Sequence, residues 1–279
     1  MPTCVNCGRP LPPDAFGEAQ QLCSQCREQI LAHTTQRSAQ QEATRRPAPA
    51  FPITSALVGI NVLVYVAMAL SGSSPFNPDT EHLVRWGANH GRETLTTQPW
   101  RLLTAAFLHG GLLHIATNMW CLWNLGLLGE PLLGPAGVVA VYVLTGVAGN
   151  LLSVAVHPQV VGAGASGAVF GLAGVLILLL KAKLLPVPPE EIRRLRKSVI
   201  YFALLNFVIG GASMVLRTSI QIDNMAHLGG FLCGLALGAP LVPRIGAARS
   251  QYAFRSWAAY GSMTLLLLVF AFGIASFWR

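Results

Sequence analysis

The sequence predicts an all-α polytopic membrane protein with a small metal-binding module at its N-terminus. Three observations support this fold class: an apolar composition, seven long segments without charged side chains, and two Cys-x-x-Cys pairs near the start of the chain. Of the 279 residues, 53% are hydrophobic and 11% are charged, whereas soluble domains contain about 25% charged residues. The bilayer is therefore the expected solvent for most of the chain.

Seven segments free of Asp, Glu, Lys and Arg have the length of transmembrane helices. A hydrocarbon core of about 30 Å requires roughly 20 helical residues. Helices satisfy their backbone hydrogen bonds internally, and these segments are about twice too long for barrel strands. The predicted spans are Ile53–Leu70, Phe107–Leu128, Gly137–Val156, Val160–Leu180, Ser198–Leu216, Asn224–Val242 and Trp257–Trp278.

The net charge of +8 is distributed unevenly across the predicted membrane. Basic residues are concentrated in the short connections between spans, which indicates orientation rather than nucleic-acid binding. With the N-terminus in the cytosol, 14 of the 19 Lys and Arg residues lie on the cytosolic side. The positive-inside rule therefore predicts a cytosolic N-terminus and an external C-terminus. We expect a multi-pass protein of the plasma membrane. No secretory signal precedes the first apolar segment, so we expect that segment to remain as an anchor.

Residues 1–33 carry two Cys-x-x-Cys pairs, Cys4 with Cys7 and Cys23 with Cys26, separated by 15 residues. Two such turns can present four thiolates to one tetrahedral ion, which predicts a structural zinc site. Two disulfides or a redox motif are the alternative, which a cytosolic location disfavours. Four cysteine ligands leave no open coordination position, so we expect a structural or partner-binding role. Residues 34–50 are polar, contain Pro47 and Pro49, and are predicted to be a flexible linker.

Polar side chains are costly inside membrane helices and usually mark functional sites. The second span carries His109, His114 and Asn118, the fourth carries Ser166 near its start, and the sixth carries His227 near its start. His114 and Asn118 are four residues apart and share a helix face, whereas His109 precedes two glycines at the helix entrance. All three spans begin at the outer face, so these groups are expected at one shallow depth. A serine needs a neighbouring base, and histidine suits that task near neutral pH.

Small residues follow Ser166 and His227 at helical spacing. Such stripes let membrane helices approach closely, which a serine–histidine contact requires. One stripe contains His227, Gly230, Gly234 and Gly238, and the other contains Ala163, Gly167, Gly171 and Gly174.

Five spaced motifs between residues 50 and 242 resemble the rhomboid family of intramembrane serine proteases. Their order along the chain is the same as in the family. They are Trp100-Arg101, the His109, His114 and Asn118 segment, Gly126-x-x-x-Glu130-x-x-x-Gly134, Gly164-Ala-Ser166-Gly167, and Ala226-His227 with Gly230.

The resemblance implies a six-helix rhomboid-like core over residues 51–243, followed by a linker and a seventh helix over 244–279. It implies catalysis by a Ser166 and His227 dyad without an acidic third member. An oxyanion site would consist of His114, Asn118 and the Ser166 backbone amide. His109 would support nearby water, and Gly164 would shape the loop before the nucleophile. Phe170 stands where many members have Tyr, and we expect its ring to stack on His227 without the hydroxyl.

The resemblance further implies acyl transfer without a catalytic metal. The substrates would be proteins with a single membrane helix, cut near its outer end. A cytosolic protein partner of the cysteine module is a further hypothesis, and no nucleic-acid partner is expected.

Two other functions are compatible with the sequence. A non-proteolytic rhomboid-like protein could bind transmembrane helices without cutting them. A transporter could line a path with the same polar residues, although Glu130 and Asp223, at the edges of spans, are the only carboxylates available for ion coupling.

Overall fold

Helices form nearly all of the membrane-embedded part of the chain. The computed structural model describes residues 3–11, 22–29, 31–32, 51–181, 188–215, 223–242 and 248–277. It divides the chain into two compact units, Met1–Ala50 and Phe51–Arg279. The predicted linker over 34–50 lies outside the described residues.

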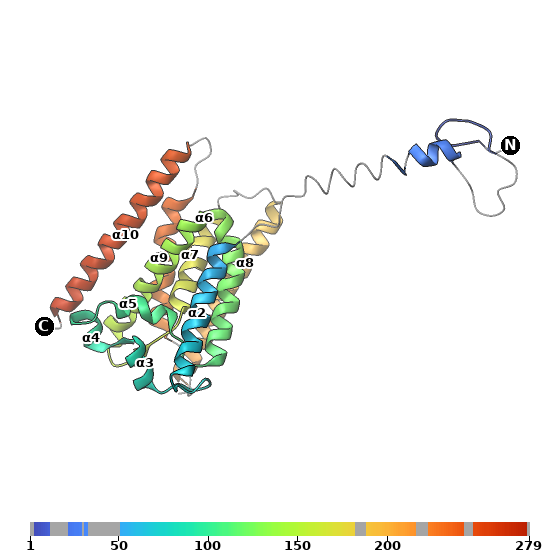
Figure 1. Ribbon diagram of the computed structural model, residues 1–279. Coiled ribbons are helices and arrows are strands. Elements are labelled where there is room, and N and C mark those ends of the chain that lie inside the picture. Colours follow the sequence, from blue (N-terminus) through green and yellow to red (C-terminus); the bar gives the residue numbers. More distant parts are fainter. Residues whose placement is uncertain are drawn as a thin grey trace. The chain divides into compact units, whose positions relative to one another are not determined.

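The larger unit contains six long helices and several short connecting elements (Figure 1). The long helices are α2 (Pro52–Leu70), α6 (Leu112–Val156), α7 (Ser166–Lys181), α8 (Pro189–Val215), α9 (Asn224–Leu241) and α10 (Arg249–Phe277). The short elements are α3 (Thr80–Trp86), β1 (Asn89–His90), α4 (Gly91–Thr96), α5 (Arg101–Thr104), the 3-10 turn η1 (Ala105–Phe107) and β2 (Val161–Gly162).

Helix α6 contains two of the predicted spans. Its 45 residues are interrupted at Gly134, whose φ of 71° and ψ of 169° are not helical. Glycine tolerates this left-handed backbone, and Pro131 and Pro135 lie on either side of it. The two halves of α6 therefore correspond to separate spans. In the described part of the chain, α2, α6, α9 and most of α10 are long and apolar enough to cross a membrane, while α7 is a shorter apolar helix.

Helix α7 lies at the centre of the bundle, where most of its residues are buried. It packs most closely against α9 through glycines of both helices. A methyl group at Gly230 would overlap the carbonyl group of Gly167, and one at Gly234 would overlap that of Gly171. These contacts confirm that the glycine stripes permit close helix approach. Ala163 was wrongly assigned to a stripe, because it precedes the helix.

Two predicted spans begin later than expected. The fourth starts at Ser166 rather than Val160, because Val161 and Gly162 pair with β1 as an antiparallel strand. The second starts at Leu112 rather than Phe107, since Ala105–Phe107 form a 3-10 turn and Gly111 has a φ of 133°.

Two other spans begin earlier than expected. Helix α8 starts at Pro189, so the basic cluster predicted to lie in a loop is helical. Proline at the start and Glu190 and Glu191 in the first turn favour helix initiation. The last helix likewise begins at Arg249 rather than Trp257.

Glu130 joins the first half of α6 to the start of α2. Its carboxylate lies at the end of the first half of α6 and is buried. It accepts hydrogen bonds from the backbone N–H of Ile53 at 3.0 Å, and from the N–H and hydroxyl of Thr54 at 2.8 and 2.6 Å. The first turn of α2 has no partner within its own helix for these N–H groups. Glu130 therefore caps α2 and fixes it against α6.

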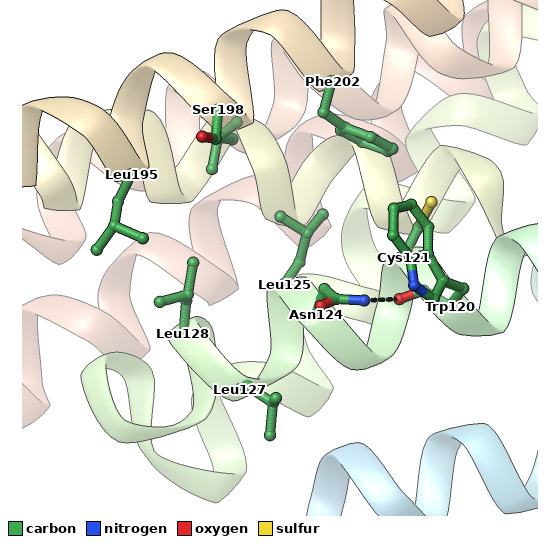
Figure 2. Close-up of a pocket in the computed structure, with 10 residues that line it drawn as sticks. Trp120, Cys121, Asn124, Leu125, Leu127, Leu128, Leu195, Ser198 and Phe202 are labelled. Carbon is green, nitrogen blue, oxygen red and sulfur yellow. Dashed lines mark hydrogen bonds between the residues drawn. The ribbon is translucent and has the colours of Figure 1, made fainter.

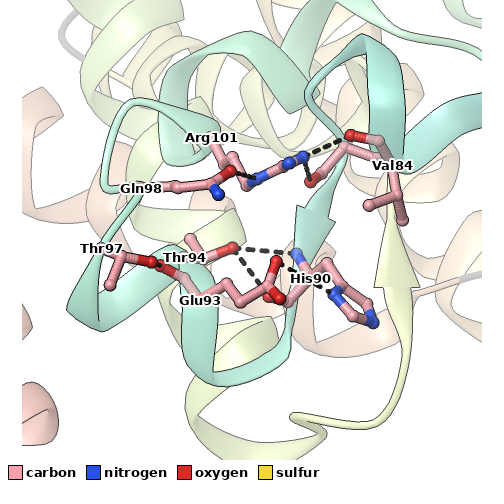
Figure 3. A network of polar contacts seen from close by, with 8 residues as sticks. Val84, His90, Glu93, Thr94, Thr97, Gln98 and Arg101 are labelled. Atoms are coloured by element: carbon pink, nitrogen blue, oxygen red, sulfur yellow. Dashed lines mark hydrogen bonds and ion pairs between the residues drawn. The ribbon is translucent and has the colours of Figure 1, made fainter.

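Arg101 holds together the connection between α2 and α6. Its buried guanidinium donates to the carbonyls of Val84 at 2.6 Å and Ala88 at 3.0 Å, and its Nε donates to Gln98 Oε1 at 2.6 Å (Figure 3). Two of these bonds join α5 to α3 and to the residue just before β1, and the third joins it to Gln98.

Candidate functional site

Four helices line a small, partly open cavity of about 90 Å³, called the polar cavity here because Ser166, Asn118, His114 and His227 face it. Five of the residues singled out in the sequence line it, and so do five others. The lining residues are His114, Thr117, Asn118 and Cys121 of α6, Ser166, Val169 and Phe170 of α7, Phe202 and Asn206 of α8, and His227 of α9.

Ser166 is the first residue of α7 and follows a tightly fixed loop. Gly164 in this loop has a φ of 139°, a conformation that favours glycine. A methyl group on Gly164 would lie 2.9 Å from His114 Nε2 and 3.7 Å from Ser166 Oγ. The N–H of Gly164 donates to the carbonyl of Ala105 at 2.9 Å, which anchors the loop to η1. The loop thus places the serine hydroxyl beside the His114 ring.

His227 lies in the first turn of α9 and is buried. The Phe170 ring stacks on its imidazole, with centroids 4.2 Å apart and planes 14° from parallel. This confirms the stacking expected for Phe170. Within the described residues, Nδ1 of His227 has no hydrogen-bond partner. No hydrogen bond joins His227 to Ser166 across that part of the chain, although both side chains face one cavity.

Asp223 fixes the start of the helix that carries His227. Its Oδ1 accepts from the N–H of Met225 at 3.1 Å and of Ala226 at 3.0 Å. Its Oδ2 accepts a hydrogen bond from Ser153 Oγ in α6. Its own carbonyl accepts from the N–H of His227 at 3.2 Å. Asp223 is therefore both a helix cap and a tether between α9 and α6.

The His114 ring is oriented by the backbone. Its Nδ1 accepts from the N–H of Gly110 at 3.3 Å. In a neutral imidazole the proton then resides on Nε2, which makes Nε2 a donor. This donor lies near the Gly164 backbone, next to Ser166. Asn118 donates one amide N–H to the carbonyl of His114 at 2.9 Å, and its second N–H is available to the cavity.

His109 lies behind His114 and does not line the cavity. It is fully buried, and the two imidazole centroids are 5.2 Å apart with the rings 68° from parallel. Neither ring nitrogen of His109 has a hydrogen-bond partner in the part of the chain that is described. Buried polar atoms of this kind are commonly satisfied by internal water.

Sequence reasoning missed several residues of this site. Asp223 stands directly before an apolar segment, which is a helix-cap signal that could have been recognised. Asn206 is a polar side chain within an apolar span, which is also a signal. Thr117, Val169 and Phe202 gave no comparable signal, because such residues occur on any membrane helix.

The smaller unit contains the candidate metal site. The four Sγ atoms of Cys4, Cys7, Cys23 and Cys26 all lie within 4.8 Å of one another. Thiolates each about 2.3 Å from one zinc ion would lie at similar separations, so the arrangement fits a tetrahedral ion. Cys4 Sγ accepts from the N–H of Cys23 at 3.3 Å, and this bond is the largest of several hydrogen bonds that together lower the pKa of the Cys4 thiol to about 6. A thiol that ionises easily is a better metal ligand.

Comparisons with known proteins agree on one family. A family model described as the Rhomboid domain matches residues 96–244. The chain is 29% identical over 234 residues to the Rhomboid protease GluP of Bacillus subtilis. The aligned region covers 84% of this chain and 43% of that protein. It is 29% identical over 225 residues to Rhomboid-like protease 1 of Toxoplasma gondii, covering 78% and 74% of the two chains.

A plant relative is more similar over a shorter region. RHOMBOID-like protein 7 of Arabidopsis thaliana is 34% identical over 162 residues, covering 58% of this chain and 49% of that protein. The chain thus spans about half the length of the Bacillus and Arabidopsis relatives. The matched domain includes every residue that lines the polar cavity.

Proposed function

The chain belongs to the rhomboid family, and we propose that it is an intramembrane serine endopeptidase with Ser166 as nucleophile and His227 as general base. The observation that carries this proposal is the single cavity that contains the serine hydroxyl, a buried imidazole and two further donors. Several relatives bear the name protease.

In the proposed reaction, Ser166 Oγ attacks a peptide carbonyl and His227 accepts the hydroxyl proton. The protonated imidazole then donates that proton to the leaving amine. Water subsequently attacks the acyl-enzyme and releases Ser166. Phe170 limits rotation of the His227 ring through stacking, and Asp223 fixes the backbone from which that ring projects.

The oxyanion of the tetrahedral intermediate needs donors that are already in place. His114 Nε2–H, the second N–H of Asn118 and the backbone N–H of Ser166 can supply them. The N–H groups of the first turn of α7 have no intrahelical acceptor, so the Ser166 N–H is available. His109 would hold water behind this donor set.

The cavity lies where α7 and α9 begin, which the positive-inside rule places near the outer face. We therefore propose that the substrates are single-span membrane proteins cut near the outer end of their helix. The protein would lie in the plasma membrane with its N-terminus in the cytosol and its C-terminus outside.

The smaller unit would hold one structural zinc ion through Cys4, Cys7, Cys23 and Cys26. No open coordination position would remain for catalysis, so this unit would act as a docking module for a cytosolic protein. Unchanged cellular partners after deletion of residues 1–46 would count against that role.

The proposal is tested by cleavage of a model single-span substrate in proteoliposomes. We expect cleavage by the wild type and none above background for Ser166→Ala or His227→Ala. Ser276→Ala is a matched control, because the Ser276 hydroxyl donates to the Phe272 carbonyl within α10 and does not line the cavity. If the wild type binds but never cuts several substrates, and Ser166→Ala binds them equally, the non-proteolytic alternative would replace the proposal.

A further inference from the structure

Among the described residues that line the polar cavity, Asn206 carries a carboxamide that the proposed reaction does not use. The dyad and the oxyanion donors already have tasks there, and the Thr117 hydroxyl donates to carbonyls of its own helix. Asn206 lies in the apolar part of α8 and is half-buried. A polar side chain is costly in such a span and usually faces a cavity or a partner. Its position therefore points to a polar partner that enters the cavity.

The turn of α8 that carries Asn206 is held against the dyad. The ring of Phe207, the next residue, lies edge-on to the ring of Phe170, with centroids 4.9 Å apart, and to the imidazole of His227 at 6.1 Å. The Phe207 carbonyl accepts a hydrogen bond from the side chain of Asn224, at the start of α9, at 3.4 Å. These contacts fix Asn206 on the α8 wall of the cavity.

Part of the hydrogen-bonding capacity of Asn206 is free. One Nδ2–H donates to the carbonyl of Phe202 at 2.9 Å. A carboxamide has two N–H donors and an oxygen with two lone pairs. The Oδ1 of Asn206 accepts no hydrogen bond from another described residue. One N–H and the oxygen of the same side chain therefore remain for a partner.

A substrate backbone offers the complementary pair of groups. The carbonyl that Ser166 attacks must first leave its hydrogen bond within the substrate helix, so the substrate is extended around the scissile bond. In an extended chain the N–H and C=O of one residue point to the same side, as they do in a hydrogen-bonded strand pair. Such groups need partners within the protein where water is scarce. A carboxamide presents an acceptor and a donor side by side and matches them.

We propose that the Asn206 carboxamide binds the backbone of one substrate residue beside the scissile bond. Its Oδ1 accepts from the N–H of that residue, and its free Nδ2–H donates to the carbonyl. The inference rests on the proposed proteolytic function. Backbone groups differ little between residues, so Asn206 strengthens the binding of substrates with different side chains to a similar degree.

The substitution Asn206→Leu removes both polar groups at nearly unchanged side-chain size. We expect kcat/KM for several single-span substrates to fall by roughly three- to tenfold, the size of one neutral hydrogen bond. The loss should appear mainly in KM, because a contact made equally in the ground state and the transition state does not change kcat. Labelling of Ser166 by a fluorophosphonate, which has no peptide backbone, should stay at the wild-type level and shows that the variant is folded.

Asn124→Leu is the matched control. Asn124 Nδ2 donates to the carbonyl of Trp120, four residues earlier in α6, at 2.7 Å, just as Asn206 donates to Phe202 (Figure 2). Asn124 lines a neighbouring apolar cavity between α6 and α8 and not the polar cavity. Both substitutions remove a carboxamide from a membrane helix, so Asn124→Leu should keep the wild-type kcat/KM.

A second measurement changes the substrate instead of the enzyme. In synthetic single-span peptides, ester bonds replace the amides that flank the scissile bond, one at a time, and each deletes one N–H without altering a side chain. We expect one of these esters to lower the wild-type kcat/KM by a factor similar to that of Asn206→Leu. The same ester should cause no further loss in Asn206→Leu. Such non-additivity indicates that the deleted N–H and Asn206 are in contact.

An unchanged kcat/KM in Asn206→Leu would overturn the inference, and so would losses from ester and substitution that multiply at every position. Lost labelling of Ser166 in Asn206→Leu would also overturn it, since the side chain would then act on the structure of the site. In each case cleavage by the wild type leaves the proposed function in place. A wild type that is neither active nor labelled overturns the proposed function, and the inference with it.

Discussion

Asp223 helps to position His227 although it does not itself line the polar cavity. Its carboxylate caps α9 and accepts a hydrogen bond from Ser153 of α6, and its backbone carbonyl accepts from the N–H of His227. Loss of the cap would let the first turn of α9 shift, and His227 lies in that turn.

We predict that Asp223→Ala lowers stability by about 1 kcal/mol, as helix-cap removal does. Misplacement of a catalytic group by about 1 Å can cost up to about 10²-fold in rate, so cleavage should fall by more than the loss of folded protein explains. Asp223→Asn retains an acceptor and should stay close to wild type. Thermal unfolding in micelles and cleavage rates measure the two effects. Wild-type cleavage by the alanine variant would contradict the assigned role.

The polar residues of the candidate site could be predicted from the sequence, but the apolar residues that line the rest of the cavity could not. Ser166, His227, His114 and Asn118 could be selected because polar groups are rare in apolar spans. The walls formed by Phe202 and Val169 could not, because an apolar residue on a membrane helix carries no sign of which neighbour it faces.

Glu130, like Asp223, caps a helix, and here the cap joins two long helices, α2 and α6. Its buried carboxylate caps α2 from another helix, with three hydrogen bonds. Gly126 allows the close approach, since a methyl group there would overlap the Thr54 side chain.

We predict that Glu130→Ala destabilises the protein by about 3 kcal/mol or more, because a hydrogen bond to a charged group contributes about 1.5–3 kcal/mol. Glu190→Ala is the control, because Glu190 is exposed and exposed substitutions usually change stability by less than about 0.5 kcal/mol. Denaturant unfolding in micelles compares them. Equal effects of the two substitutions would refute the capping role.

Helix existence was predictable, whereas several helix ends were not. Each of the seven apolar segments falls largely within one of the long helices, and two of them correspond to the two halves of α6. The start of α7 could not be placed, because Val161 and Gly162 pair with Asn89 and His90, which are distant in sequence. The start of α8 was missed because its first turns are charged and extend beyond the apolar segment.

The chain divides into two compact units, and each carries one of the two candidate sites. Every residue that lines the polar cavity belongs to Phe51–Arg279, and every cysteine of the candidate metal site belongs to Met1–Ala50. Catalysis and metal binding should therefore be separable.

We predict that deletion of residues 1–46 leaves cleavage of a model substrate in proteoliposomes unchanged and abolishes zinc binding. Metal content is measured on purified protein by mass spectrometry. Cys4→Ser combined with Cys23→Ser should also abolish zinc binding, while Cys233→Ser, at a buried cysteine of α9, should not. Zinc retained by the deletion variant, or cleavage lost with the metal, would refute this separation.

The central claim is that Ser166 is a nucleophile activated by His227. Covalent labelling by a fluorophosphonate tests it without a known substrate, followed by mass spectrometry of the modified peptide. We predict a label on Ser166 in the wild type, none in Ser166→Ala, and strongly reduced labelling in His227→Ala. Labelling of another residue, or equal labelling of Ser166 when His227 is replaced, would contradict the proposed dyad.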